Sequence, residues 1–221
     1  MKAILIFSLI CVCISIIYGE NNYITCASCD LGDTKCENCT GAACVTIHQL
    51  SEYGGSSNGH YRGCSNQTLC EEVAFTLTPA DKKQIQSSSA CCATDLCNQN
   101  LTLSSPPVGT VENGVNCPVC ENYNSLQVCQ ANTHLACRGA EQKCITLEGK
   151  TKDGKGNFTF QGCATENACK LMVDDLVPFK DKIYTLSKNA TCTDRGTLAA
   201  ISSPMVLFPV VVGFLLANVR S

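Results

Sequence analysis

The sequence predicts an all-β, disulfide-rich protein built from two tandem copies of one small module. Three observations lead to this fold class. The chain contains 20 cysteines, their spacing repeats along the chain, and segments between them alternate apolar and polar residues. Alternation is typical of strands with one buried face. Large aliphatic residues are few outside the two terminal segments, so disulfides must supply stability that a small apolar core cannot.

The first 19 residues are expected to be a secretory signal peptide. Lys2 precedes an apolar run from Ala3 to Ile17, and Gly19 is a small residue just before Glu20. The run is too short to span a bilayer comfortably, which favours a signal peptide over an N-terminal anchor. Export brings the chain into an oxidising compartment, where cysteines form disulfides.

Residues 194–221 are expected to be a GPI-anchor signal, with attachment at Asp194 or Gly196. An apolar tail from Met205 to Val219 follows a polar-to-small stretch. A spanning helix would need about 20 apolar residues, which this segment does not offer. The protein is therefore predicted to be extracellular and held on the cell surface by a GPI anchor, with simple secretion as the alternative.

The cysteine spacing indicates an internal duplication. Two cysteines leave with the signal peptide, and the other eighteen fall into a group of ten and a group of eight. Each group opens with C-x2-C. Nineteen residues separate Cys44 from Cys64, and eighteen separate Cys144 from Cys163. This repetition places one module at residues 20–98 and another at 116–193.

A linker joins the two modules. Residues 99–115 are rich in Ser, Pro, Gly and Asn, and the pair Pro106-Pro107 stiffens the stretch. Such a composition is typical of a segment that connects folded units without forming a core of its own.

The long segments inside each cysteine group are expected to be β-hairpins. VTIHQ and HYR flank EYGGSSNG in the first module, and ITLE and NFTFQ flank GKTKDGKG in the second. Glycine and asparagine supply the turn conformations that hairpins need. The apolar residues that alternate with polar ones are Ile145, Leu147, Phe158 and Phe160, and in the first module's third loop Val73, Phe75 and Leu77.

Composition and motif spacing argue against several function classes. The net charge is −3 with no basic field, so no nucleic-acid partner is expected. The C-x2-C-x6-C-x2-C pattern from Cys26 to Cys39 has a shorter gap than the roughly 15–20 residues of zinc ribbons. The CPVC sequence at Cys117 has no thioredoxin-like context. No metal, cofactor or redox site is predicted.

The residues also give no sign of an enzyme. His48, His60 and His134 lie in hairpin or loop contexts, and no nucleophile–histidine–carboxylate signature accompanies them. In CCATDLC, Asp95 stands where the active-site histidine of a secreted phospholipase A2 would follow the paired cysteines. The protein is therefore predicted to be non-catalytic.

The cysteine pattern resembles the Ly-6/uPAR family of three-finger domains. The matching features are the opening C-x2-C, a cysteine before each β-arm and the CC-x4-CN ending at Asn98. The resemblance implies a palm of clustered disulfides from which three β-loops project, with Asn98 tying the chain end to the central strands. The family connectivity carried onto this chain gives Cys26–Cys44, Cys29–Cys36, Cys39–Cys64, Cys70–Cys91, Cys92–Cys97, Cys117–Cys144, Cys120–Cys129, Cys137–Cys163 and Cys169–Cys192.

The second module departs from the full pattern. Thr193 follows Cys192 where a second adjacent cysteine is expected, so the terminal disulfide clip is absent. The stretch CRGAEQKCITLEG from Cys137 to Gly149, and the FQGC after it, are similar to the two-domain gamma-type phospholipase A2 inhibitors. This resemblance implies two tandem three-finger domains.

The function expected from these features is non-catalytic protein binding by a cell-surface glycoprotein. Rigid disulfides preorganise exposed loops, which lowers the entropy cost of forming an interface. One alternative, implied by the resemblance, is inhibition of secreted phospholipase A2 by direct complex formation. The other is a structural or adhesive role at the cell surface.

Surface sites are expected at sequons and at hairpin tips. The N-x-[ST] sequons are Asn38, Asn66, Asn100, Asn157 and Asn189. The candidate contact residues at the tips are Tyr53, His60, Tyr61, Lys150, Lys152 and Lys155. Hairpin tips are also polar simply because they are solvated, so an ordinary surface role is the competing interpretation.

Overall fold

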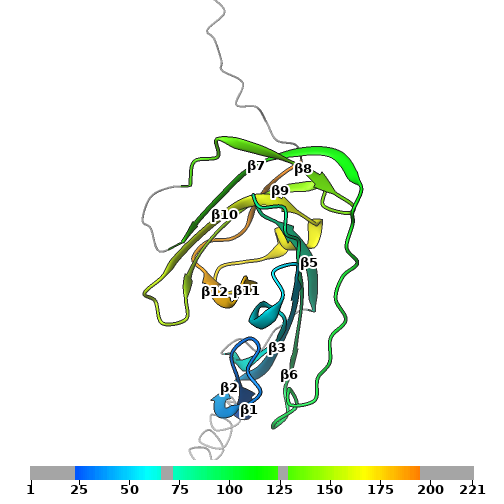
Figure 1. Ribbon diagram of the computed structural model, residues 1–221. Coiled ribbons are helices and arrows are strands. Elements are labelled where there is room, and N and C mark those ends of the chain that lie inside the picture. Colours follow the sequence, from blue (N-terminus) through cyan, green and yellow to red (C-terminus); the bar gives the residue numbers. More distant parts are fainter. Residues whose placement is uncertain (1–22, 66–71, 124–128, 195–221) are drawn as a thin grey trace, which may run out of the picture.

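The computed structural model describes residues 23–65, 72–123 and 129–194, and its regular structure is almost entirely β (Figure 1). This confirms the predicted all-β class. The predicted signal peptide, Asn66, Cys70 and Gly196 lie outside the described residues.

The first module forms three antiparallel hairpins. Its strands are β1 (Ile24–Ser28), β2 (Glu37–Gly41), β3 (Ala43–Ser51), β4 (Gly59–Ser65), β5 (Val73–Thr78) and β6 (Ile85–Cys92). Strands β1 and β2 make a separate two-stranded sheet, while β3 pairs with both β4 and β6, and β5 pairs with β6. The short 3-10 helix η1 (Gly55–Ser57) lies between β3 and β4.

The second module repeats this order. Its strands are β7 (Glu112–Tyr123), β8 (Thr133–Arg138), β9 (Lys143–Thr151), β10 (Asn157–Ala164), β11 (Leu176–Phe179), β12 (Lys182–Leu186) and β13 (Thr191–Thr193). The spatial order β11-β12-β9-β10 matches β5-β6-β3-β4, so the duplication is present in the strand order as well as in the spacing. A 3-10 helix, η2 (Glu166–Lys170), follows β10. Strand β7 begins at Glu112, inside the stretch expected to be linker.

The two modules share one sheet and one core. Strand β10 pairs with β5 across the module boundary, matching Cys163 with Thr78 and Ala164 with Leu77. The largest buried cluster takes Phe75 and Leu77 from the first module and, among others, Phe160 from the second. The modules therefore pack as a single unit rather than as two independent domains.

The disulfides hold the base of each hairpin. The structure contains these pairs: Cys26–Cys44, Cys29–Cys36, Cys39–Cys64, Cys92–Cys97, Cys117–Cys144, Cys120–Cys129, Cys137–Cys163 and Cys169–Cys192. Each is the partner assignment that the family resemblance implies. Cys91 is also disulfide-bonded. Its implied partner, Cys70, lies outside the described residues.

The C-terminal ends of the two modules are held in different ways. The Asn98 side chain is fully buried, donates to the carbonyls of Ala27 and Val45, and accepts from the Ala27 amide. The second module has no terminal disulfide like Cys92–Cys97, because Thr193 follows Cys192. There β13 pairs with β9, which places Thr193 opposite Cys144 and fixes the last described residues by sheet hydrogen bonds instead.

Candidate functional site

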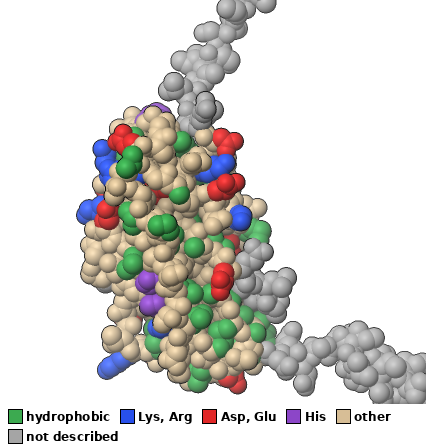
Figure 2. Space-filling model, turned by 90° about the vertical axis from the view of Figure 1, so that its right-hand side faces the viewer, with side chains coloured by type: hydrophobic (Ala, Val, Ile, Leu, Met, Phe, Trp, Pro, Cys, Tyr) green, Lys and Arg blue, Asp and Glu red, His purple; other side chains and the backbone are tan. Residues whose placement is uncertain are grey.

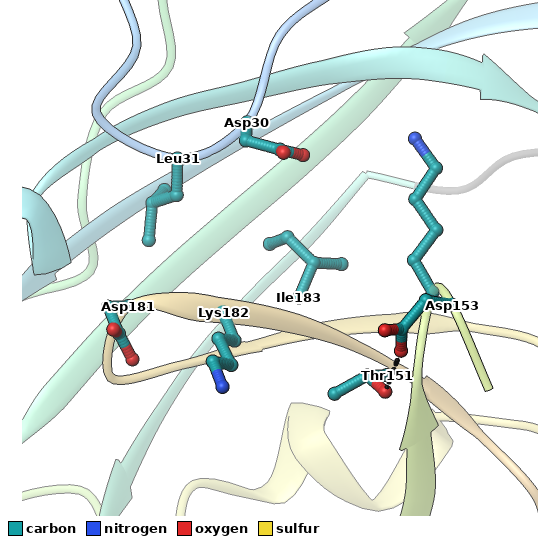
Figure 3. A pocket seen from close by; sticks show the side chains of 8 residues that line it. Asp30, Leu31, Thr151, Asp153, Asp181, Lys182 and Ile183 are labelled. Carbon is teal, nitrogen blue, oxygen red and sulfur yellow. Dashed lines mark hydrogen bonds between the residues drawn. The ribbon is translucent and has the colours of Figure 1, made fainter. Parts of the chain in front are cut away.

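Three loops from both modules converge on one cleft, with a volume of about 440 Å³ (Figure 3). The loop after β1 contributes Asp30 and Leu31, the tip of the β9–β10 hairpin contributes residues 151–153, and the β11–β12 turn contributes residues 181–183. The cleft is therefore composite, and neither module could form it alone.

The cleft has an apolar floor and a charged rim. Leu31 and Ile183 are only 6% and 8% exposed and pack in one cluster with Val45, Ile47 and Tyr61. The charged lining residues are Asp30, Lys152, Asp153, Asp181 and Lys182. In Figure 3 Leu31 lies between Asp30 and Asp181, and Ile183 lies near the centre of the group. An apolar centre within a polar rim is the anatomy of a protein-binding surface.

The β9–β10 tip is held rigid by its own hydrogen bonds. The Thr151 hydroxyl donates to Asp153 Oδ1 at 2.5 Å, and the Lys155 amide donates to the same oxygen at 3.1 Å. These bonds lower the pKa of Asp153, with the Thr151 bond the larger cause. Gly154 takes a φ of 69°, which glycine accepts without strain. The tip thus presents a fixed negative charge to the cleft.

The β11–β12 turn is anchored to the first module. Gln49 Nε2 donates to the Lys180 carbonyl at 2.6 Å, across the module boundary. The Lys180 ammonium forms an ion pair with Glu121 at 3.0 Å and lies 5.2 Å from the centre of the Tyr53 ring. Because this turn carries three of the cleft residues, the module interface sets the cleft geometry.

Tyr53 belongs to that interface. Its hydroxyl donates to Asp81 Oδ2 at 2.7 Å, and Lys83 lies 4.9 Å from the ring centre. Burial, followed by the hydrogen bond to Asp81, raises the pKa of Tyr53 above its usual value. The predicted contact residue Tyr53 therefore helps to pack the modules together in this structure.

Among the predicted contact residues at the hairpin tips, Tyr61 is buried and the three lysines are exposed. Tyr61 is only 3% exposed, so its prediction as a surface contact is wrong: it lies in the buried cluster that also contains Leu31 and, from the second module, Ile183. Lys150, Lys152 and Lys155 are exposed. Of these, Lys152 lines the cleft, and its ammonium lies 5.7 Å from the centre of the Tyr61 ring.

His60 stacks on His48 across the β3–β4 ladder, with ring centres 4.4 Å apart. Figure 2 shows two adjacent histidines on one face of the molecule. Ser105 of the linker lies 3.2 Å from His48 Nδ1. Burial lowers the pKa of both rings, and for His60 the charges of His48 and Arg62 add to this. His48 therefore connects the sheet to the linker through Ser105.

Disulfide bonding bears on the metal and redox patterns. The four cysteines of the C-x2-C-x6-C-x2-C pattern are all in disulfides, so none offers a thiolate. Cys117 and Cys120 bond to different partners rather than to each other. Two groups of three cysteine sulfurs lie close together, and these sulfurs also belong to disulfides.

The sequons differ in access. Asn38, Asn100 and Asn189 are exposed, while Asn157 is half-buried at the start of β10. Asn189 uses its Oδ1 to accept from the Val173 amide, which leaves its nitrogen open for a glycan. Exposure is what an occupied sequon requires, so glycosylation at these positions stays a prediction compatible with the fold.

The predicted anchor region begins at the edge of the described residues. Asp194 is 84% exposed and forms an ion pair with Lys143. That hydrogen-bonded pairing lowers the pKa of Asp194. Within the described residues, no helix is long and apolar enough to cross a membrane.

Of the cleft residues, sequence reasoning had named only Lys152 as a contact and missed the other seven: Asp30, Leu31, Thr151, Asp153, Asp181, Lys182 and Ile183. The stretch LVPFKDKIYTL alternates around a short polar turn, a signal that could have predicted the β11–β12 hairpin. No local signal shows that this turn docks beside the first loop of the other module.

Comparison with known proteins supports the resemblance to the Ly-6/uPAR family. Residues 113–197 match the u-PAR/Ly-6 domain. A phospholipase A2 inhibitor of the gamma type from Elaphe climacophora is 31% identical over 113 residues, covering 49% of this chain and 54% of the inhibitor. The urokinase plasminogen activator surface receptor of Bos taurus is 27% identical over 167 residues, covering 69% of this chain and 48% of the receptor.

The chain spans about half the length of the curated relatives it matches. Among solved structures, mouse TEX101 aligns at 21% identity with a TM-score of 0.35, covering 78% of this chain and 95% of that one. The matched domain and the two kinds of relative confirm the predicted resemblance.

Proposed function

Because residues 113–197 carry a u-PAR/Ly-6 domain, we propose that this chain is a non-catalytic extracellular binding protein that captures a protein partner in the composite cleft. The observation that carries the proposal is the convergence of three loops from two modules on one apolar floor. Loops fixed by disulfides and by a shared core lose little entropy on binding.

The cleft chemistry suits a protein loop better than a small apolar ligand. Its floor is narrow, formed by Leu31 and Ile183, and its rim carries carboxylates and ammonium groups of both signs. A partner that places an apolar side chain on the floor can pair its own charges with the rim, which gives orientation and specificity.

A secreted phospholipase A2 is the first partner class to test. The relatives that favour it are named phospholipase A2 inhibitors, and they match about half of this chain. We expect the protein, with disulfides intact, to bind at least one member of a panel of secreted phospholipases A2 saturably and to reduce its lipid hydrolysis. Surface plasmon resonance and a vesicle hydrolysis assay measure the two effects.

A charge reversal in the cleft sharpens this test. Asp181→Lys is expected to weaken any such binding by at least about tenfold, since it changes the rim charge without touching the buried floor. Glu72→Lys, an exposed position that does not line the cleft, is the matched control. Equal affinities of the two variants would show that the cleft is not part of the binding site. No binding across the panel would favour a structural or adhesive role.

The finer proposal for location is a GPI anchor, attached at Asp194 or Gly196. Asp194 is exposed at the end of the described fold, where attachment would leave the core undisturbed. We expect phosphatidylinositol-specific phospholipase C to release the protein from the surface of cells that express it, as measured by flow cytometry. Retention of the protein after treatment, with a known GPI-anchored protein released in the same sample, would contradict the anchor.

A further inference from the structure

A buried carboxyl group lies where the two modules join. Glu141 is in the turn between β8 and β9 and is only 1% exposed. Its Oε2 accepts a hydrogen bond from the Thr78 hydroxyl of the first module at 2.7 Å. A fully buried charged carboxylate is costly unless it is well paired, so its protonation state affects how the modules fit together.

The groups around Glu141 are almost all uncharged. Thr76 and Thr78 face it from β5, Gln84 from the residues before β6, and Asn113 of β7 donates to its backbone carbonyl. Among the described residues, Arg138 is the one charged group that acts on this carboxyl. Burial raises the pKa of Glu141, while the hydrogen bond from Thr78, the nearby polar side chains of Gln84 and Thr76, and the Arg138 charge act in the opposite direction.

A proton on Glu141 would give one of the unpartnered buried oxygens in this cluster a donor. Within the described part of the chain, Glu141 Oε1, Gln84 Oε1 and Thr76 Oγ1 are buried without a hydrogen-bond partner. A carboxylate only accepts hydrogen bonds, so it cannot pair with the oxygen of an amide. A protonated carboxyl has one O–H to donate, which lets it pair with a neighbouring acceptor.

The same place carries the strand pairing between the modules. Thr78 is paired with Cys163 in the β5–β10 ladder. The Thr76 amide donates to Thr165 Oγ1 at 3.0 Å, and the Thr165 amide donates to the Thr76 carbonyl at 3.2 Å. Hydration of a charged Glu141 carboxylate would require these bonds between Thr76 and Thr165 to open.

We propose that Glu141 is a proton-dependent lock between the two modules: its carboxyl is protonated when β5 and β10 are paired, and loss of that proton loosens the pairing. This inference concerns the module interface and does not depend on which partner the protein binds. Since the cleft takes residues from both modules, the lock would also make the cleft geometry depend on pH.

The sign of the pH effect follows from linkage. When the modules separate, Glu141 becomes exposed and regains an ordinary pKa of about 4.3. Because the pKa is raised in the closed state, closure of the modules is most favourable at a pH below the open-state pKa of about 4.3. As the pH rises, the equilibrium constant for closure falls by up to about tenfold per pH unit, and the stabilisation from the proton is gone above the raised pKa. The lock is thus strongest in acid and weakens toward alkaline pH.

Hydrogen–deuterium exchange measures the lock directly. We expect the protection of the Thr76 and Thr165 amides, corrected for intrinsic exchange, to fall in the wild-type protein between pH 4.5 and 8.5, by up to about tenfold per unit. In Glu141→Gln the protection should be independent of pH, because the amide copies the donor of the protonated acid. Glu141→Ala should lose protection at every pH, since Thr78 loses its acceptor.

The matched control is Glu148→Gln, which changes a partly exposed glutamate paired with Lys188 outside this interface. It should keep the wild-type pH dependence. A flat wild-type profile, or the same slope in Glu141→Gln as in wild type, would overturn the proposal. Should Glu141→Ala not fold, the comparison between wild type and Glu141→Gln still decides the outcome.

Discussion

Replacing Phe179 with alanine is expected to lower the free energy of unfolding by about 3–5 kcal/mol, because it empties the centre of the shared core. The Phe179 ring is fully buried. It lies 5.1 Å from Phe158 and 5.4 Å from Phe160, measured between ring centres. Both neighbours belong to β10, the strand that also pairs with the first module, so the cavity would weaken both modules at once.

Denaturant unfolding under non-reducing conditions measures this loss. Tyrosine fluorescence is a suitable probe, since the chain has 6 tyrosines and no tryptophan. Met172→Ala, at a position that is 60% exposed, is the control and should cost less than about 0.5 kcal/mol. A loss below about 1 kcal/mol for Phe179→Ala, or two separate transitions in the wild type, would contradict a single core shared by the modules.

The features that sequence reasoning predicted are local or repeated. Cysteine spacing and a second copy of the same pattern predict hairpins whose bases are cross-linked. Alternation along one strand predicts which of its residues face inward, and Phe158 and Phe160 are buried accordingly. Such signals depend on residues close together in the chain, where geometry is limited to a few choices.

The features that sequence reasoning missed depend on contacts between distant segments. Tyr61 has the sequence context of an exposed hairpin arm, yet it is buried in a cluster that also takes Ile183 from the second module. Glu141 sits in a polar stretch that reads as solvated, yet the β5–β6 hairpin of the first module buries it. Both outcomes follow from the docking of one module on the other, and neither segment carries a pattern that encodes its partner.

The docking also explains why a chain with few large aliphatic residues can be stable. Each module alone would expose apolar side chains of its sheet, because these side chains pack in one cluster with those of the other module. Joining the sheets lets Phe75 and Leu77 of the first module and the phenylalanines of the second bury one another. The disulfides then hold the bases of the hairpins, and in the second module they form a buried cluster of their own with Val119 and Leu135.

Asn98→Asp is expected to lower the free energy of unfolding by at least about 3 kcal/mol at neutral pH, more than Asn98→Ala at about 2–3 kcal/mol. The alanine leaves the Ala27 amide and two carbonyls without their partner. The aspartate is worse, because it keeps the acceptor for that amide but turns a negative oxygen toward the carbonyls of Ala27 and Val45.

The pH dependence separates the two causes. Burial against two carbonyls raises the pKa of the introduced carboxyl in the folded state, so Asn98→Asp should regain stability as the pH falls toward 4, where a proton restores one donor. Asn98→Ala should show the wild-type dependence. Asn167→Asp is the matched control, since that exposed side chain makes one bond, to the Ala74 carbonyl, and should cost less than about 1 kcal/mol. Similar losses of unfolding free energy for Asn98→Asp and Asn167→Asp would mean that the Cys92–Cys97 disulfide, and not Asn98, holds the end of the first module.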